Sequence, residues 1–71
     1  MRNVNRIYPF MSELQTIWAV YYSDLRFAQF MMNFLNYITL ESKQDPFFIE
    51  DDACLEYLKE YAKKSPYYKE K

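Results

Sequence analysis

Apolar residues in the first third of the chain repeat with the period of an α-helix. Seven large apolar side chains recur at intervals of three and four: Ile7, Phe10, Met11, Leu14, Ile17, Trp18 and Tyr21. This spacing places them on one face of a helix. Asn3 or Asn5 can cap its start, because an asparagine oxygen accepts a free amide hydrogen of the first turn. The pattern predicts a helix that starts near Asn5, or a kinked turn before Pro9, and a helix end at Tyr21–Asp24.

The next segment, Leu25–Ile38, is apolar except for four residues that we call the polar stripe: Arg26, Gln29, Asn33 and Asn36. Successive residues of a helix are about 100° apart, so the stripe forms one line about 80° wide. About 280° of the helix surface is then apolar, whereas an ordinary surface helix has an apolar stripe little wider than ~100°. We predict a helix from Leu25 to Thr39, capped by Ser23 or Asp24, that lies in the middle of the fold and is covered on nearly every side.

The residue pattern of the remaining chain predicts a loop, a short apolar segment that we call the plug, and a third helix. Leu40–Pro46 is polar, and its Asp-Pro pair favours a turn. Phe47-Phe48-Ile49 is too short for a paired strand, so we expect an extended segment that places two rings in the core. Glu50-Asp51-Asp52 begins a helix, because carboxylates are stabilised at the positive end of the helix dipole. Ser65-Pro66 ends it.

These elements predict an all-α fold. We expect one compact three-helix domain at residues 1–66, with the extended aromatic plug between the second and third helices, and a C-terminal tail at residues 67–71. A core in a chain of 71 residues rarely contributes more than about 3–5 kcal/mol. The single cysteine excludes an internal disulfide, and the lack of histidine argues against a structural zinc site. Dense aromatic packing or self-association has to stabilise the fold instead.

The composition argues against most enzyme classes. Without glycine the chain has no phosphate-binding loop or dinucleotide fingerprint, and without histidine it lacks the commonest general base. A formal net charge of −1 provides no general attraction to nucleic acid or to an anionic membrane. No apolar run is long enough to span a bilayer, and the N-terminal residues do not resemble a signal peptide. We expect a cytoplasmic, non-enzymatic protein that uses no cofactor or metal and contacts no membrane.

Two small clusters have a chemical and a structural interpretation. The acidic residues Asp45, Glu50, Asp51 and Asp52 could hold calcium or magnesium, but the alternating order of a calcium loop is missing and the helix dipole accounts for them. Cys54 could have a lowered pKa near a helix start. No histidine can activate it, so we interpret it as a small buried apolar residue.

The C-terminal segment 63–71 supports an alternative function. It mixes lysines with Tyr67 and Tyr68, as proteins that bind single-stranded nucleic acid do, although nearby glutamates dilute its charge. The alternative is a small regulatory factor that contacts nucleic acid, or an enzyme acting on nucleic acid, through this segment. A solvated helix face with a frayed tail explains the same residues.

The polar stripe also has two interpretations. Arg26, Gln29, Asn33 and Asn36 can be the solvent edge of an otherwise buried helix. They can also be a partner-binding site, because amides donate and accept hydrogen bonds and can fix the register of a helix–helix interface. The aromatic excess and the methionines leave room for an exposed apolar patch. We predict a protein–protein interaction module that forms a homodimer, or binds another protein, through apolar surface of the first two helices.

Three blocks occur in a recognisable order. They are Arg6-Ile7 with Glu13-Leu14-x-x-Ile17-Trp18, then Asp24-Leu25-Arg26-Phe27-x-Gln29 with Asn33, then Asp45-Pro46-Phe47-Phe48-Ile49-Glu50-Asp51. Over about residues 6–60 the chain resembles small uncharacterised bacterial and phage-associated proteins with the pattern P-D-L-R-x-G-Q followed by D-P-F-Y-x-E-D.

Ser23 and Ala28 stand where those proteins often have proline and glycine. The resemblance implies a compact helical intracellular protein of unknown function. It transfers no catalytic residue. Arg26, Gln29 and Asn33 fall within its middle block and are therefore the first residues to test.

Overall fold

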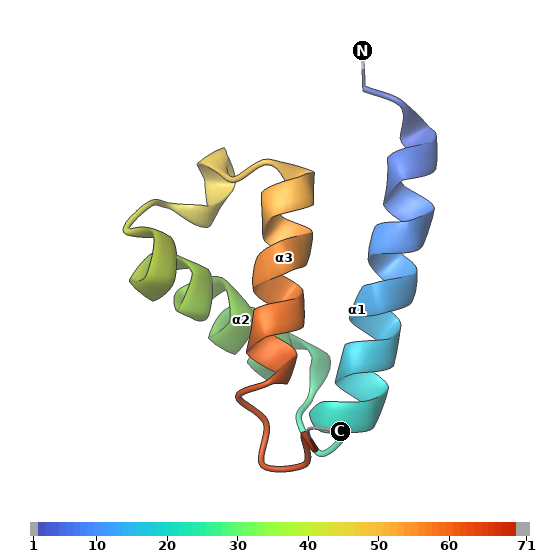
Figure 1. Cartoon of the computed structure of the whole chain (residues 1–71), viewed down its shortest axis with the longest axis vertical. Helices are drawn as coiled ribbons and strands as arrows, with labels where there is room; N and C mark the ends of the chain where they lie inside the picture. The colour runs from blue at the N-terminus through green and yellow to red at the C-terminus, as the bar shows by residue number, and fades with distance from the viewer. Residues whose placement is uncertain (1, 70–71) are drawn as a thin grey trace.

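The structure, a computed structural model, describes residues 2–69 and consists of helices joined by short turns (Figure 1). The elements in chain order are the 3₁₀ helix η1 (Val4–Arg6), α1 (Ile7–Tyr21), α2 (Phe27–Ser42), the 3₁₀ helix η2 (Pro46–Phe48) and α3 (Asp51–Ala62). The predicted all-α, three-helix fold is confirmed. Residues 70 and 71 of the predicted tail lie outside the described residues.

The start of α1 follows the sequence pattern closely. Asn3 caps η1, because its side-chain oxygen accepts a hydrogen bond from the Asn5 amide at 2.9 Å. α1 then begins at Ile7, which places Pro9 in the first turn. Proline is tolerated there because amide groups of the first turn have no partner within the helix.

α2 begins two residues later than predicted, and neither Ser23 nor Asp24 caps it. Both residues lie in a turn that the Leu25 amide closes by donating to the Tyr22 carbonyl oxygen at 3.0 Å. The cap is instead made by Gln29, whose side-chain oxygen accepts a hydrogen bond from the Arg26 amide at 2.9 Å. This is the second half of a capping box, in which a residue of the first turn reaches back to the cap residue.

α2 also extends three residues past the predicted end at Thr39. It stops at Lys43, which has a left-handed backbone (φ 61°) and donates from its amide to the Thr39 carbonyl oxygen at 3.0 Å. Glycine is the usual residue at such a helix end, but the chain contains none. Leu40–Ser42 is therefore helical and not part of a loop.

α1 and α3 lie side by side and run in the same direction (Figure 1). Their C-terminal ends are joined where Ser65 Oγ donates to the Tyr21 carbonyl oxygen at 2.8 Å. α3 also contacts α2 and so lies between the other two helices. The prediction that the second helix is the middle one, covered on nearly every side, is wrong. The turn at Tyr22–Arg26 makes a corner, so α2 leaves α1 instead of packing along it.

One face of each helix forms the core, whose buried residues are Leu14 and Ile17 of α1, Phe30, Phe34 and Ile38 of α2, and Leu58 and Ala62 of α3. Tyr61 of α3 lies at the centre of its aromatic part. Its ring lies 4.8 Å from Tyr22, 5.2 Å from Tyr37 and 5.7 Å from Phe34, measured between ring centroids. Such pairs add to the stabilisation that comes from burying the rings.

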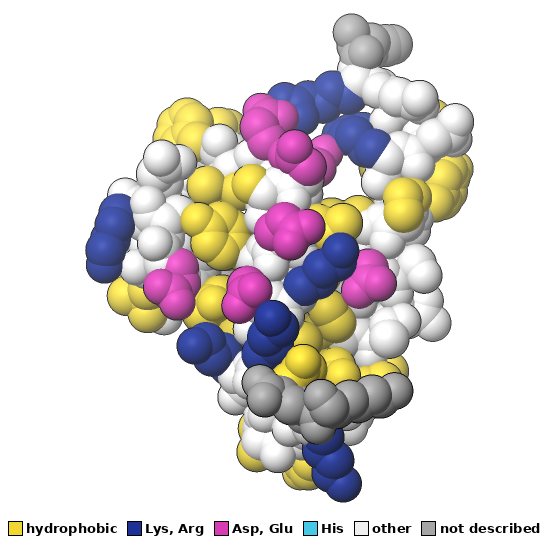
Figure 2. Space-filling model, in the orientation of Figure 1, with side chains coloured by type: hydrophobic (Ala, Val, Ile, Leu, Met, Phe, Trp, Pro, Cys, Tyr) yellow, Lys and Arg dark blue, Asp and Glu magenta, His cyan; other side chains and the backbone are white. Residues whose placement is uncertain are grey.

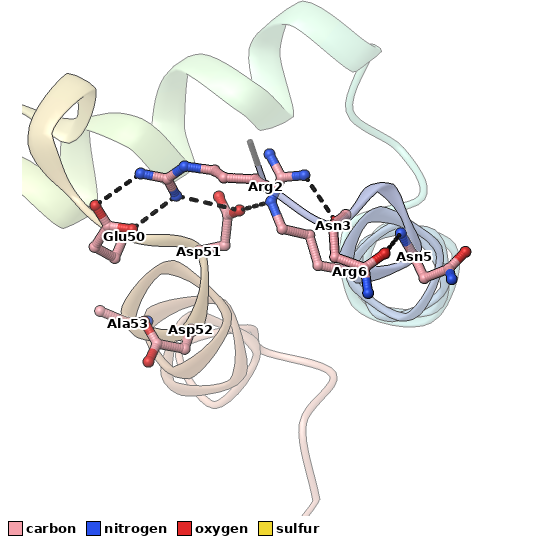
Figure 3. A network of polar contacts seen from close by, with 8 residues as sticks. All are labelled: Arg2, Asn3, Asn5, Arg6, Glu50, Asp51, Asp52 and Ala53. Carbon is pink, nitrogen blue, oxygen red and sulfur yellow. Dashed lines mark hydrogen bonds and ion pairs between the residues drawn. The ribbon is translucent and has the colours of Figure 1, made fainter.

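Charged side chains of both signs lie along α3 on the face shown in Figure 2. At the start of α3 they connect to the N-terminal segment, in an arrangement that we call the N-terminal clasp (Figure 3). Arg2 donates two hydrogen bonds to the Glu50 carboxylate, at 2.7 and 3.1 Å, and Arg6 donates one to Asp51. The Arg2 guanidinium lowers the pKa of Glu50 by hydrogen bonding and by its charge. Glu50 and Asp51 therefore bind arginines at the start of α3.

Phe47 and Phe48 do not enter the core, so the predicted extended aromatic plug is wrong. The segment is the 3₁₀ helix η2, and the two residues are 84% and 72% exposed. The Asp45 side chain accepts a hydrogen bond from the Phe47 amide at 2.9 Å, which together with Pro46 fixes the turn. Only Ile49 packs against the core.

Candidate interaction surface

The side of α2 that faces away from the core is exposed and uncharged. We call it the outer face of α2; its residues are Ala28, Gln29, Met32, Asn33, Leu35, Asn36, Thr39 and Leu40, all exposed. The sequence has no charged residue at positions 27–40, although 27% of the chain is charged. Interface cores are typically depleted of charge and enriched in methionine and aromatic residues. The outer face shares the lack of charge of an interface core and contributes one exposed methionine, Met32.

An open groove runs between the outer face of α2 and η2. Its volume is about 620 Å³, and it is lined by Met32, Asn33, Leu35, Asn36 and Thr39 on one side and by Asp45, Pro46 and Phe47 on the other. Met32, which is 71% exposed, and Phe47 are its most prominent apolar side chains. The groove is mainly apolar with a few polar groups, as ligand and peptide sites usually are.

The structure divides the polar stripe into two pairs. Arg26 and Gln29 form the N-terminal cap of α2, so the Gln29 amide oxygen already has a structural role. Asn33 and Asn36 line the groove instead. All four residues are exposed. The residues predicted as one site are therefore not brought together as one.

The amides of Asn33 and Asn36 are available for a partner. Among residues 2–69, neither side chain forms a hydrogen bond to another residue, whereas Thr39 and Ser42 bond to carbonyl groups of α2. A carboxamide has two donor hydrogens and an acceptor oxygen and no net charge. The two amides can thus pair with polar groups across an interface without the desolvation penalty of a charge.

The sequence pattern missed Phe47 and Phe48 as surface residues. Apolar rings usually indicate a core, and that rule placed them inside. The Asp45-Pro46 pair could have indicated that they lie on the surface, because an Asp side chain that bonds to the backbone two residues later favours a tight turn. In this turn the two rings pack edge to face outside the core, with 5.1 Å between their centroids.

η1 and the start of α1 carry a second apolar area, which we call the α1 row: Val4 of η1 with Ile7, Tyr8 and Met11 of α1, all exposed. At its end a pocket of about 190 Å³ is lined by Met11, Leu14, Gln15, Trp18 and Phe27. This pocket is much smaller than the groove beside α2.

The lysines at positions 63, 64 and 69 of the C-terminal basic segment are exposed, but two of its side chains make contacts within the fold. Lys63 lies 3.5 Å from a Glu60 carboxylate oxygen. The Tyr68 ring packs against Tyr21 with 5.8 Å between centroids. Tyr67 is exposed. Part of the predicted nucleic-acid segment is therefore used within the fold.

Cys54 is half-buried near the start of α3. Burial raises the pKa of its thiol, and the negative charge of Asp51 raises it further. A thiol with a raised pKa is a poor nucleophile at neutral pH, because only the thiolate reacts. The position fits a small apolar side chain.

Within residues 2–69, no three cysteine or acidic side chains lie close enough to hold a metal ion. In the same part of the chain, none of the helices combines the length and apolar character needed to cross a membrane. Comparisons of the sequence with protein-family models and with curated proteins, and of the structure with solved structures, give no match. The resemblance to bacterial and phage-associated proteins thus stays a prediction.

Proposed function

We propose that the protein is a non-enzymatic interaction module that self-associates through apolar surface of α1 and α2, in the cytoplasm of a bacterium or a phage-infected cell. The observation that carries this proposal is the uncharged outer face of α2 with its exposed Met32, Leu35 and Leu40. Large exposed apolar patches on small proteins usually mark interaction sites. The resemblance seen in the sequence supports the cellular setting.

The small size of the domain supports the same proposal. A single core of this length contributes only about 3–5 kcal/mol. A second subunit that binds only the folded state stabilises it by mass action. Association would therefore compensate for the missing disulfide and metal.

Light scattering at micromolar concentrations tests the proposal. We expect about twice the chain mass of 8.8 kDa, and a melting temperature that rises with protein concentration. A monomeric mass at every concentration, with a constant melting temperature, would contradict self-association.

The alternative function, a factor that contacts nucleic acid through its C-terminus, is tested by a separate experiment. Exposed Tyr67 could stack on a base. If this function exists, a gel shift should weaken steeply with salt and should be lost when residues 67–71 are removed. A salt-independent shift would argue against it.

A further inference from the structure

The outer face of α2 is chemically suited to meet a copy of itself. A two-fold symmetric interface places the same patch on both sides, so each residue contacts another residue of the same patch, and only residues at the axis meet their own copy. A densely charged patch would repel itself, but positions 27–40 contain no charge, and the only charged residue among those that line the groove is Asp45. Asn33 and Asn36 both donate and accept, so each can pair with the same residue type of a second copy. A strongly charged partner would find only the single Asp45 carboxylate here.

The shape of this surface is also self-complementary. The groove beside α2 is hollow, and Phe47, which forms part of its rim, is 84% exposed. A projecting ring and a hollow therefore lie next to each other on one surface. When two copies face each other, the ring of each can enter the groove of the other.

The exposed area sets an upper limit on the contact, and that limit is close to the size of a standard interface. The apolar side chains that would be covered are Phe47, Phe48, Met32, Leu35 and Leu40. With about 200 Å² for a fully exposed ring, their combined exposed surface is roughly 600 Å². Asn33, Asn36 and Thr39 bring the total near the ~800 Å² that each partner contributes to a standard interface.

We propose that a second copy of this chain packs its α2 against the outer face of α2 across a two-fold axis, with Asn33 and Asn36 in the contact and Phe47 of each copy in the groove of the other. This dimer geometry rests on the proposed self-association. It narrows the surface of α1 and α2 proposed above to α2 with η2, and it leaves the α1 row outside the contact.

Complementary charges at Met32 test the geometry. Met32→Lys and Met32→Glu should each weaken dimerisation by about a hundredfold, because like charges then meet within the contact. An equimolar mixture of the two variants should form a heterodimer. The side chain is exposed, so both variants should keep the helical circular dichroism of the wild type. The matched control is Met11→Lys on the α1 row, which should remain a dimer.

Cross-linking provides a second measurement that does not depend on charge. In a Cys54→Ser background, Asn36→Cys should cross-link between copies with a short bis-maleimide at least several-fold more than Gln15→Cys. The geometry is overturned, while self-association stands, if Met32→Lys remains a dimer or if Gln15→Cys cross-links more than Asn36→Cys. A monomeric wild type overturns both and leaves the surface to a different protein.

Discussion

The ring of Tyr22 lies flat on the ring of Tyr61, with 4.8 Å between centroids and 9° between planes. The Tyr22 hydroxyl also donates to the Tyr61 carbonyl oxygen at 2.7 Å. One side chain thus fixes the turn after α1 to α3 by stacking and by a hydrogen bond. Tyr61 also connects α3 to α2, because its ring contacts Phe34 and Tyr37 of α2.

Replacing Tyr61 should therefore remove most of the stability. Truncating a large core ring to alanine costs about 3–5 kcal/mol, which equals the whole stability expected of one core this small. We expect Tyr61→Ala to be largely unfolded by circular dichroism at room temperature. Tyr67→Ala, which truncates an exposed ring, should change the free energy of unfolding by less than about 0.5 kcal/mol. A cooperative wild-type melt of Tyr61→Ala would show that the ring is dispensable.

Tyr22 should make the fold sensitive to alkali. Burial, with the neighbouring Tyr61, raises the pKa of the Tyr22 phenol from 10.0 to about 12. The folded state then holds this proton more tightly than the unfolded state. The stabilisation is complete below pH 10 and is lost as the pH rises toward 12.

Tyr22→Phe should cost about 1 kcal/mol near neutral pH, because the hydrogen bond to Tyr61 is lost. The difference in unfolding free energy from the wild type should shrink as the pH rises above 10. Urea titrations across this range measure it, and tyrosinate absorbance reports the late titration directly. A difference that does not vary with pH would contradict the assignment.

Glu50 should contribute stability that acid and salt remove. Arg2 lowers the pKa of this carboxyl below its ordinary 4.5, so the contribution is present above that pH and is lost as the pH falls below it. Glu50→Gln should therefore melt at a lower temperature than the wild type near neutral pH. The two proteins should converge in acid, and also in high salt, where exposed charges are screened.

Glu56→Gln is the control for the N-terminal clasp. Its carboxylate lies 3.9 Å from Lys59 on the same helix and joins no distant parts of the chain. A pair of this kind contributes only a few tenths of a kcal/mol. Equal effects of the two substitutions would mean that the clasp adds nothing beyond a local pair.

Lys43→Gly should stabilise the protein. A left-handed backbone costs a non-glycine residue about 1–2 kcal/mol. Glycine avoids this cost, but it loses more conformational entropy on folding, which offsets part of the gain. We expect a net gain of about 0.5–1 kcal/mol in the free energy of urea unfolding. Lys43→Ala removes the same charge without easing the backbone and should be nearly neutral. A loss of stability in Lys43→Gly would refute the strain argument.

The sequence predicted the features that depend on neighbouring residues. The spacing of Leu14, Ile17 and Trp18 and the acidic start of α3 are local signals, and the structure agrees with them. The start of α2 was missed because Gln29 caps from inside the helix, and its end was missed because Lys43 takes a backbone that favours glycine.

The errors in the fold concern packing between distant segments. The sequence pattern shows how much of the surface of α2 is apolar. It does not show whether other segments of the same chain pack against that surface. α3 covers one side, and the outer face stays open. The polar stripe was therefore located on the exposed side, but its division between a helix cap and a groove depends on where η2 lies.

The parallel pairing of α1 with α3 has a consequence for biosynthesis. α1 leaves the ribosome before α3, which covers its apolar face and ends 41 residues later, from Tyr21 to Ala62. At ~5–20 residues per second this interval is about 2–8 s. Of the contacts that close the fold, the pair of Arg2 with Glu50 becomes possible within this interval, and the bond of Ser65 to Tyr21 becomes possible just after it. During those seconds the apolar face of α1 is exposed on the nascent chain to chaperones and to neighbouring chains.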